Sequence, residues 1–224
     1  QTASNNIPNM WPSSTTATGN GYVYVSGGDN LGTIQSTVYY ARLQPDGNLG
    51  AWQTAANTLP QPVYNASSAV VNGYLYVLGG RASGGAFTAL AYYSKLGADG
   101  TPGTWSSMAL GNFAQTGIAV KGSYIYLIAG DDNPSGLQNL VVAYRSNADG
   151  SLTSLGAAGT TNAYANESGV AVGNYVYAIG GYDGSVNRTE VYYAQPAADG
   201  SISSWSSTTA IPGAASGTIA AVVN

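Results

Sequence analysis

One heptapeptide occurs four times in this chain, as YVYVSGG (22–28), YLYVLGG (74–80), YIYLIAG (124–130) and YVYAIGG (175–181). The last glycines of the four copies lie 52, 50 and 51 residues apart. A second string follows each copy, namely TVYYARL (37–43), LAYYSKL (90–96), LVVAYRS (140–146) and EVYYAQP (190–196). A third closes the unit, as DGNLGAW (46–52), DGTPGTW (99–105), DGSLTSL (149–155) and DGSISSW (199–205). The chain is therefore one unit of about 51 residues used four times.

Each string has the chemistry of a β-strand. Tyr-X-Tyr alternation has a period of two, and aromatic and β-branched residues dominate. A fourth strand-like segment precedes each heptapeptide, at 13–18, 67–71, 117–120 and 169–172. The Asp-Gly pairs between the second and third strings predict hairpins. Four short strands per unit, with no helical spacing of apolar residues, indicate the blade of a β-propeller.

The composition excludes several classes of function. Only 7% of the residues are charged, and the chain has no His and no Cys. It therefore lacks a Ser-His-Asp triad, a thiol nucleophile, disulfides and His- or Cys-ligated metals. Six Lys and Arg residues in a chain of net charge −4 argue against a nucleic-acid partner. No apolar run of about 18 residues predicts a membrane span.

The surface chemistry indicates a location. Ser, Thr, Asn and Tyr replace the missing charged residues, so solubility depends on hydroxyl and amide groups. We therefore expect an extracellular or cell-surface protein.

The unit resembles the kelch-type β-propeller repeat, the family that includes the central domain of galactose oxidase. A small apolar strand is followed by an aromatic-apolar-Gly-Gly string, a Val-Tyr-Tyr strand and a terminal Trp. The resemblance covers essentially all 224 residues, although Gln61 follows Pro60 where kelch repeats usually carry Arg, and the third unit has Ala129-Gly130 and Leu155. It implies an all-β propeller with blades of four antiparallel strands in one domain, 1–224, and the four repeats predict four blades. The approximate repeats are 7–58, 59–108, 109–158 and 159–210.

The segment 211–224 is an extra copy of the beginning of a repeat. GTIAAVVN (217–224) repeats the segment around 67–72, so it is the first strand of a further or ring-closing unit. If it completes the first blade, the ring closes with four blades and one of the two copies of this strand is surplus, so that it could be displaced. Alternatively, the surplus strand pairs with another molecule through its exposed edge, or the chain is part of a longer array.

Residues in the loops that enter the first strands, and in the loops after the paired glycines, are the candidate binding residues. An aromatic precedes each heptapeptide by about ten residues, and amides lie beside several of these aromatics. The residues after the glycines carry much of the charge, Asp131 and Asp132 included. We expect these loops to share one face, and the candidates are Trp11, Tyr64, Asn65, Phe113, Gln115, Tyr164, Asn166, Asp29, Arg81, Asp183 and Arg188. The aromatics either anchor the loops against the next blade or form a ring for a neutral sugar or a peptide.

The sequence offers little for catalysis or for a cofactor. Asp131, Asn133 and Ser135 match the opening of a calcium loop, but position twelve is Val142 instead of Glu. We therefore expect no cofactor, with Ca²⁺ as a weak candidate. The copper centre and cofactor of galactose oxidase need His and Cys, which are absent. Glu167 and Glu190 are the only glutamates for a glycosidase, which needs two carboxylates at a set separation.

These observations favour a non-catalytic extracellular binding or adhesion module that presents its loop face to a glycan or a protein. The first alternative is a structural subunit of a self-assembling surface layer or filament, joined through a Tyr-rich surface or terminal strands. The second alternative is a carboxylate-dependent glycoside hydrolase or lyase.

Overall fold

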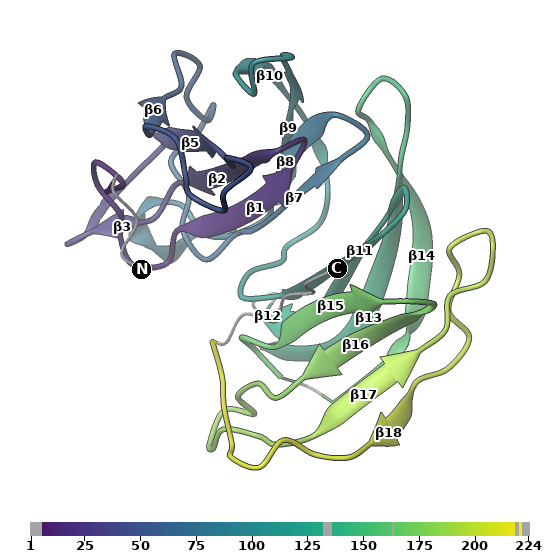
Figure 1. Cartoon of the computed structure of the whole chain (residues 1–224). Helices are drawn as coiled ribbons and strands as arrows, with labels where there is room; N and C mark the ends of the chain where they lie inside the picture. The colour runs from purple at the N-terminus through teal and green to yellow at the C-terminus, as the bar shows by residue number, and fades with distance from the viewer. Residues whose placement is uncertain (1–5, 132–135, 163, 218–219, 221–224) are drawn as a thin grey trace. The chain divides into compact units, whose positions relative to one another are not determined.

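The computed structural model describes residues 6–131, 136–162, 164–217 and 220, and it confirms the predicted fold class (Figure 1). The chain is all-β, with four antiparallel four-stranded sheets, which we call blades 1 to 4. Apart from a single turn of 3-10 helix, η1 (Ser83–Gly85), no helix is assigned in the described part of the chain. None of its helices has the length and hydropathy to cross a membrane.

The blades fall two by two into two compact units, unit 1 (1–112) and unit 2 (113–224). In unit 1, blade 1 contains β1 (Thr15–Gly19), β2 (Tyr22–Ser26), β5 (Val38–Arg42) and β6 (Gln53–Thr54). Blade 2 contains β7 (Ser67–Val71), β8 (Tyr74–Leu78), β9 (Leu90–Leu96) and β10 (Pro102–Ala109). A short ribbon joins β3 (Asp29–Asn30) and β4 (Thr33–Ile34). In unit 2, blade 3 contains β11 (Gly117–Lys121), β12 (Tyr124–Asp131), β13 (Leu137–Ser146) and β14 (Leu152–Thr160), and blade 4 contains β15 (Ser168–Val172), β16 (Tyr175–Ile179), β17 (Val191–Ala194) and β18 (Ser206–Thr208).

Turn chemistry sets the order of strands within each blade. Asn20-Gly21 joins β1 to β2 with φ values of 53° and 78°, the positive pair that a two-residue hairpin turn needs. The four predicted Asp-Gly turns also form. In each turn the Asp carboxylate accepts a hydrogen bond from a backbone N–H two residues later, as Asp99 does from Thr101 at 3.0 Å. The four strands of each blade are therefore neighbours in its sheet in the order in which they follow along the chain.

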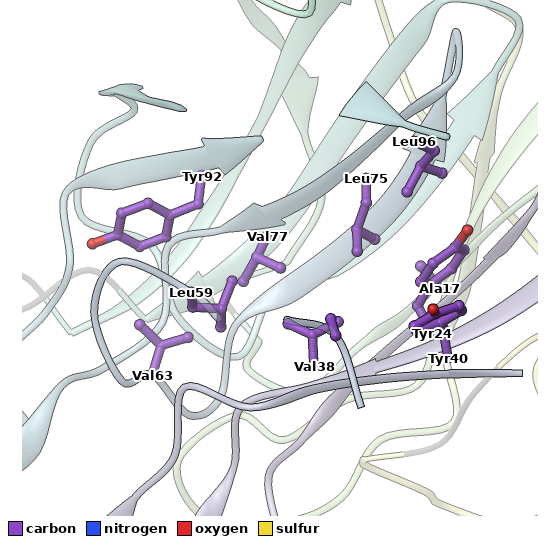
Figure 2. Packing of buried hydrophobic residues seen from close by; sticks show 11 residues of the cluster. Ala17, Tyr24, Val38, Tyr40, Leu59, Val63, Leu75, Val77, Tyr92 and Leu96 are labelled. Atoms are coloured by element: carbon purple, nitrogen blue, oxygen red, sulfur yellow. The ribbon is translucent and has the colours of Figure 1, made fainter. Parts of the chain in front are cut away.

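The core of unit 1 lies where its two blades pack together (Figure 2). Tyr24 and Val38 come from blade 1, and Leu75 and Val77 come from blade 2; all four are 0% exposed. These residues occupy alternate positions on their strands, so the period-two pattern of the sequence places them on one face. Unit 2 has an equivalent core, with Ile128 and Val141 from blade 3 and Val176 from blade 4.

The tryptophans contact the preceding blade in each unit. The indole N–H of Trp105 donates to the carbonyl of Asn57 at 3.1 Å, and that of Trp205 donates to the carbonyl of Ala158 at 2.8 Å. Trp105 and Trp205 therefore each connect their own blade to the blade before it.

The inner strand of blade 1 comes from the N-terminal copy of the repeated segment. Residues of β1 pair with β2 from Thr15–Ser26 to Gly19–Tyr22, so the N-terminal copy forms the first strand of blade 1. The first strand of a blade pairs best with the strand that follows it through a tight turn. The extra copy lies at the C-terminal end, where Gly181 N–H donates to Ala215 at 2.8 Å and Gly217 N–H donates to Asn166 at 2.9 Å. Most of the predicted strand 217–224 lies outside the described residues.

Candidate functional site

In each repeat, the loop that enters the first strand pairs with the residue that follows the glycine pair. Tyr64 and Arg81 exchange backbone hydrogen bonds of 2.9 and 2.8 Å, and Ala165 and Tyr182 exchange two of 2.9 Å. These loops therefore lie at the same end of their blade, which we call the loop end. The equivalent pairs are Pro12–Asp29, Tyr64–Arg81, Ala114–Asp131 and Ala165–Tyr182.

The predicted aromatics at the loop end are not four equivalent residues. Trp11, Phe113 and Tyr164 share one position of the repeat, but the equivalent residue in the second repeat is Val63, and Tyr64 is one residue later. Trp11 is half-buried, with its ring centroid 6.0 Å from that of Tyr39. Phe113 and Tyr64 are also half-buried, whereas Tyr164 is only 4% exposed. The ring face of Tyr164 therefore packs inside the protein instead of meeting solvent.

The recurrent amides have a backbone explanation. Asn65, Gln115 and Asn166 have φ values of 53°, 56° and 55°, and Ser13 holds the same position in the first repeat at 61°. Asn tolerates this left-handed conformation better than most residues. The backbone N–H of Asn166 donates to the carbonyl of Gln115 at 2.7 Å, and that of Asn65 donates to Ser13 at 3.0 Å. The amides therefore recur at the position where the backbone at the loop end of one blade forms a hydrogen bond with that of the neighbouring blade.

The predicted charged residues of unit 1 make local contacts. Asp29 accepts a hydrogen bond of 2.6 Å from the N–H of Gly32 at the tip of the β3–β4 ribbon. The guanidinium of Arg81 lies 4.0 Å from the ring centroid of Phe87, and it donates to the carbonyl of Gly85 at 3.1 Å.

The weak calcium candidate falls largely outside the described residues. Asp131 ends β12, whereas Asn133 and Ser135 are not described. Within the part of the chain that the structure covers, no three acidic residues gather in an arrangement that could hold a metal ion.

The loop end of blade 4 brings several polar side chains together. Arg188 forms an ion pair with Asp183, and its other terminal nitrogen lies 3.9 Å from Glu190. Its guanidinium also lies 6.0 Å from the ring centroid of Tyr164. We call this set, together with the residues Asn162 and Tyr192 described next, the Arg188 cluster.

Hydrogen bonds fix the geometry of this cluster. The side-chain amide of Asn162 donates to the hydroxyl of Tyr164 at 2.8 Å and also to the hydroxyl of Tyr192. Burial raises the pKa of both tyrosines, so their hydroxyls stay neutral. The backbone N–H groups of Val186 and Ser185, each 2.8 Å from Asp183, lower the pKa of that carboxyl and keep it ionised.

Asn162, Tyr182 and Tyr192 were not among the predicted binding residues, and Glu167 and Glu190 were considered only as carboxylates for a glycosidase. Tyr182 is 36% exposed and lies directly after the glycine pair, a position that its register with Asp29, Arg81 and Asp131 could have indicated. Glu167 is 5% exposed, and neither carboxyl oxygen has a hydrogen-bond partner among the described residues.

Glu167 replaces smaller side chains of the other repeats. Ser14 holds the equivalent position in the first repeat, where its hydroxyl donates to the carbonyls of Trp11 and Gly27 at 2.7 and 2.9 Å. Glu167 instead packs over Gly181, where an added Cβ would lie 2.7 Å from the Glu167 Cγ. Burial raises the pKa of Glu167 to about 8, so the carboxyl is mostly neutral at pH 7.

Comparison with known proteins adds no assignment to these observations, because no protein-family model and no curated protein sequence matches the chain.

Proposed function

We propose that this protein is a non-catalytic extracellular binding or adhesion module that presents the loop end of its blades to a glycan or protein ligand. The Arg188 cluster carries the proposal, because it gathers an ion pair, two tyrosines and an amide at one end of blade 4. The paired glycines and terminal tryptophans of the repeat favour a kelch-type propeller as the scaffold. A rigid scaffold with ligand-binding loops at one end is a common arrangement in such folds.

The chemistry of the cluster favours a polar ligand such as a glycan. The guanidinium of Arg188 offers hydrogen-bond donors and has 38% of its side chain exposed, and Tyr182 adds an exposed aromatic ring within the same loops. Sugars present hydroxyl groups to such donors and acceptors and an apolar face to aromatic rings. Glu190, with 37% of its side chain exposed, supplies an acceptor.

The placement of the glutamates supports binding over catalysis. A glycosidase needs one carboxyl that protonates the leaving group and a second that acts on the sugar ring from the other side. Glu167 has the raised pKa of a general acid but is 5% exposed, so its carboxyl does not meet a sugar that arrives from solvent. An enzyme that uses Glu167 is therefore the weaker proposal.

A glycan array, followed by calorimetry with the sugars that bind, tests the proposal. We expect Tyr182→Ala and Arg188→Gln to weaken binding at least tenfold, which corresponds to about 1.4 kcal/mol. The control is Val172→Ala, because Val172 is 44% exposed but lies at the opposite end of blade 4. Sugar affinity that is unchanged in both loop-end variants, or the release of hydrolysis products, would contradict the proposal.

A further inference from the structure

A cavity of about 340 Å³ lies between the two blades of unit 2, at the end of the blades opposite to the loop end. Blade 3 supplies the end of β11 and the turn that follows it, and blade 4 supplies the turn after β17. The cavity, which we call the Lys121 cavity, is lined by Lys121, Gly122, Tyr124, Pro196, Ala197 and Ala198. Its volume is within the range of about 300–1,000 Å³ that is typical of small-molecule sites.

Lys121 brings an unbalanced positive charge to this cavity. Its ammonium group donates a hydrogen bond of 2.7 Å to the carbonyl of Gly173 in blade 4. That carbonyl is neutral, and an ammonium group has three N–H donors, so two donors remain for another partner. No carboxylate oxygen of the described residues lies within ion-pair distance of the Lys121 nitrogen. The cavity therefore offers a cation to a ligand.

A lysine occurs at this position in only one of the four repeats. Gly19, Val71 and Val172 hold the equivalent positions of the other three. In unit 1 a Cβ added at Gly19 would lie 2.5 Å from the Val70 Cβ, so the two blades leave no room for a side chain there. In unit 2 the same position carries the half-buried side chain of Lys121. The cation is therefore a feature of this cavity and not of the repeat.

The apolar walls of the cavity are held rigidly. The ring of Tyr124 packs over Gly200, where an added Cβ would lie 2.7 Å from the Tyr124 Cγ. The hydroxyl of Tyr124 donates to the carbonyl of Ala198 at 3.1 Å, so the ring is fixed at both ends. Pro196 adds a second apolar wall whose own ring restricts its backbone. Walls that are fixed in advance reduce the entropy that is lost when a ligand binds.

Asp199 limits the charge that a ligand can carry. It follows the cavity wall directly in the sequence, and its carboxylate accepts hydrogen bonds from the N–H and the hydroxyl of Ser201, at 3.0 and 2.7 Å. These bonds hold the carboxylate in its own turn and lower its pKa, so it stays ionised without neutralising Lys121. Because like charges repel, a ligand with one negative charge suits the cavity better than a phosphate with up to two.

We propose that the Lys121 cavity binds a single carboxylate carried on a six-membered ring, with the carboxylate on the ammonium of Lys121 and the ring against Tyr124 and Pro196. A hydrogen bond between an ammonium and a carboxylate is stronger than one between neutral groups, and the aromatic wall favours the apolar face of a ring. Acidic sugars and aromatic acids share this chemistry. All the walls belong to unit 2 and lie opposite to the loop end, so this inference does not depend on the proposed ligand site.

Titrations followed by the NMR shifts of backbone amides test the proposal on the unmodified chain. The probes are glucuronate, which is an acidic sugar, and benzoate, which is an aromatic acid. Glucose lacks the carboxylate and acetate lacks the ring, so these two are the matched controls. We expect glucuronate, benzoate or both to shift the amides of Lys121, Gly122 and Ala197, with at least tenfold higher affinity than the controls; which probe binds identifies the source of the carboxylate. Binding of neither probe at millimolar concentration, or equal binding of a control, would overturn the proposal.

Substitutions of the two lysines of the chain separate the site from the overall charge. Lys121→Gln should weaken binding of the ring carboxylate at least tenfold, because it keeps a donor for Gly173 but removes the charge. Lys121→Arg keeps the charge and should retain most of the affinity. The matched control is Lys95→Gln, which removes the same charge at an exposed position of β9 in unit 1. An affinity that Lys121→Gln leaves unchanged, or an equal loss in Lys95→Gln, would overturn the proposal.

The same titrations distinguish this cavity from the Arg188 cluster, which also contains a cation. Binding in the Lys121 cavity should persist in Arg188→Gln, because Arg188 lies at the loop end of blade 4. Shifts confined to residues 182–190 that disappear in Arg188→Gln and persist in Lys121→Gln would place the carboxylate at the loop end and overturn the proposal. A loop end that binds no glycan would leave the titration of the Lys121 cavity unchanged, so the two proposals fail independently.

Discussion

Glu167 is the side chain on which a change of pH should act most strongly. It is 5% exposed, and both of its carboxyl oxygens lack a hydrogen-bond partner among the described residues. Burial disfavours the charged form and raises the pKa of Glu167 to about 8. Because the chain has no His and no Cys, no other side chain has an ordinary pKa between pH 5 and 8. The pH dependence of stability in this range therefore reports on Glu167.

The pKa difference between the two states sets the size of the effect. In the unfolded chain Glu167 titrates near its ordinary pKa of 4.5, and below that pH both states hold the proton. As the pH rises further, the unfolded chain releases the proton while the folded chain keeps it. The free energy of unfolding then falls by about 1.4 kcal/mol per pH unit until the folded-state pKa is reached. The total loss is about 5 kcal/mol, a large part of the 5–15 kcal/mol that stabilises an ordinary domain.

The carboxyls of the hairpin turns act in a different pH window. Hydrogen bonds from Thr101 lower the pKa of Asp99, and hydrogen bonds from Ser201 lower that of Asp199. Their contribution to stability is present above the ordinary pKa of Asp and is lost as the pH falls through the lowered value. The turn carboxyls therefore do not contribute to the pH dependence of stability between pH 5 and 8, where Glu167 acts.

Urea unfolding followed by Trp fluorescence, repeated from pH 4.5 to 9, measures the effect. We expect the free energy of unfolding of the wild-type protein to fall steadily up to about pH 8. Glu167→Gln has the same shape without a charge, so its stability should be nearly constant over this range. The matched control is Glu190→Gln, which alters the only other glutamate, and it should keep the slope of the wild type because 37% of that side chain is exposed.

Two outcomes would contradict the expected role of Glu167. A wild-type stability that is constant between pH 5 and 8 would mean that the carboxyl of Glu167 is solvated in the folded chain. A slope that persists in Glu167→Gln would mean that another group titrates in this range.

Two further substitutions test the roles assigned to the repeated residues, both by urea unfolding at one pH. Gly200→Ala should lower the free energy of unfolding by about 2–4 kcal/mol, because the new Cβ meets the Tyr124 ring and the residue has a positive φ. Gly73→Ala should lower it by about 1 kcal/mol, because only the backbone is strained there. Equal losses in the two variants would exclude the close packing of Tyr124. Asn65→Ala should lower the free energy of unfolding by about 1 kcal/mol and Asn65→Gly should leave it almost unchanged, because a φ of 53° strains Ala but not Gly. Equal losses in both variants would instead indicate that the side-chain amide itself stabilises the fold.

The repeat made most of the fold predictable. The strands expected at 67–71 and 117–120 are β7 (Ser67–Val71) and β11 (Gly117–Lys121) in the structure, and the four Asp-Gly turns form where expected. Alternation and turn chemistry are local properties, so they are visible in a single sequence. The candidate site was less predictable. The aromatic of the second repeat, Tyr64, is one residue out of register with the others, and Val63 occupies the equivalent position.

Residue identity and spacing are enough to specify the repeating unit, its strands and turns, and the absence of His and Cys chemistry. Which copies of equivalent residues are buried becomes visible only in the folded chain. Tyr126 is 0% exposed and Tyr177 is half-buried, although both stand in the same heptapeptide. Likewise, Gly100 is buried and Gly47 is exposed, although both hold the same position in the Asp-Gly turns of their repeats. Burial depends on what packs against a residue in the folded chain, and the sequence of one repeat does not contain that information.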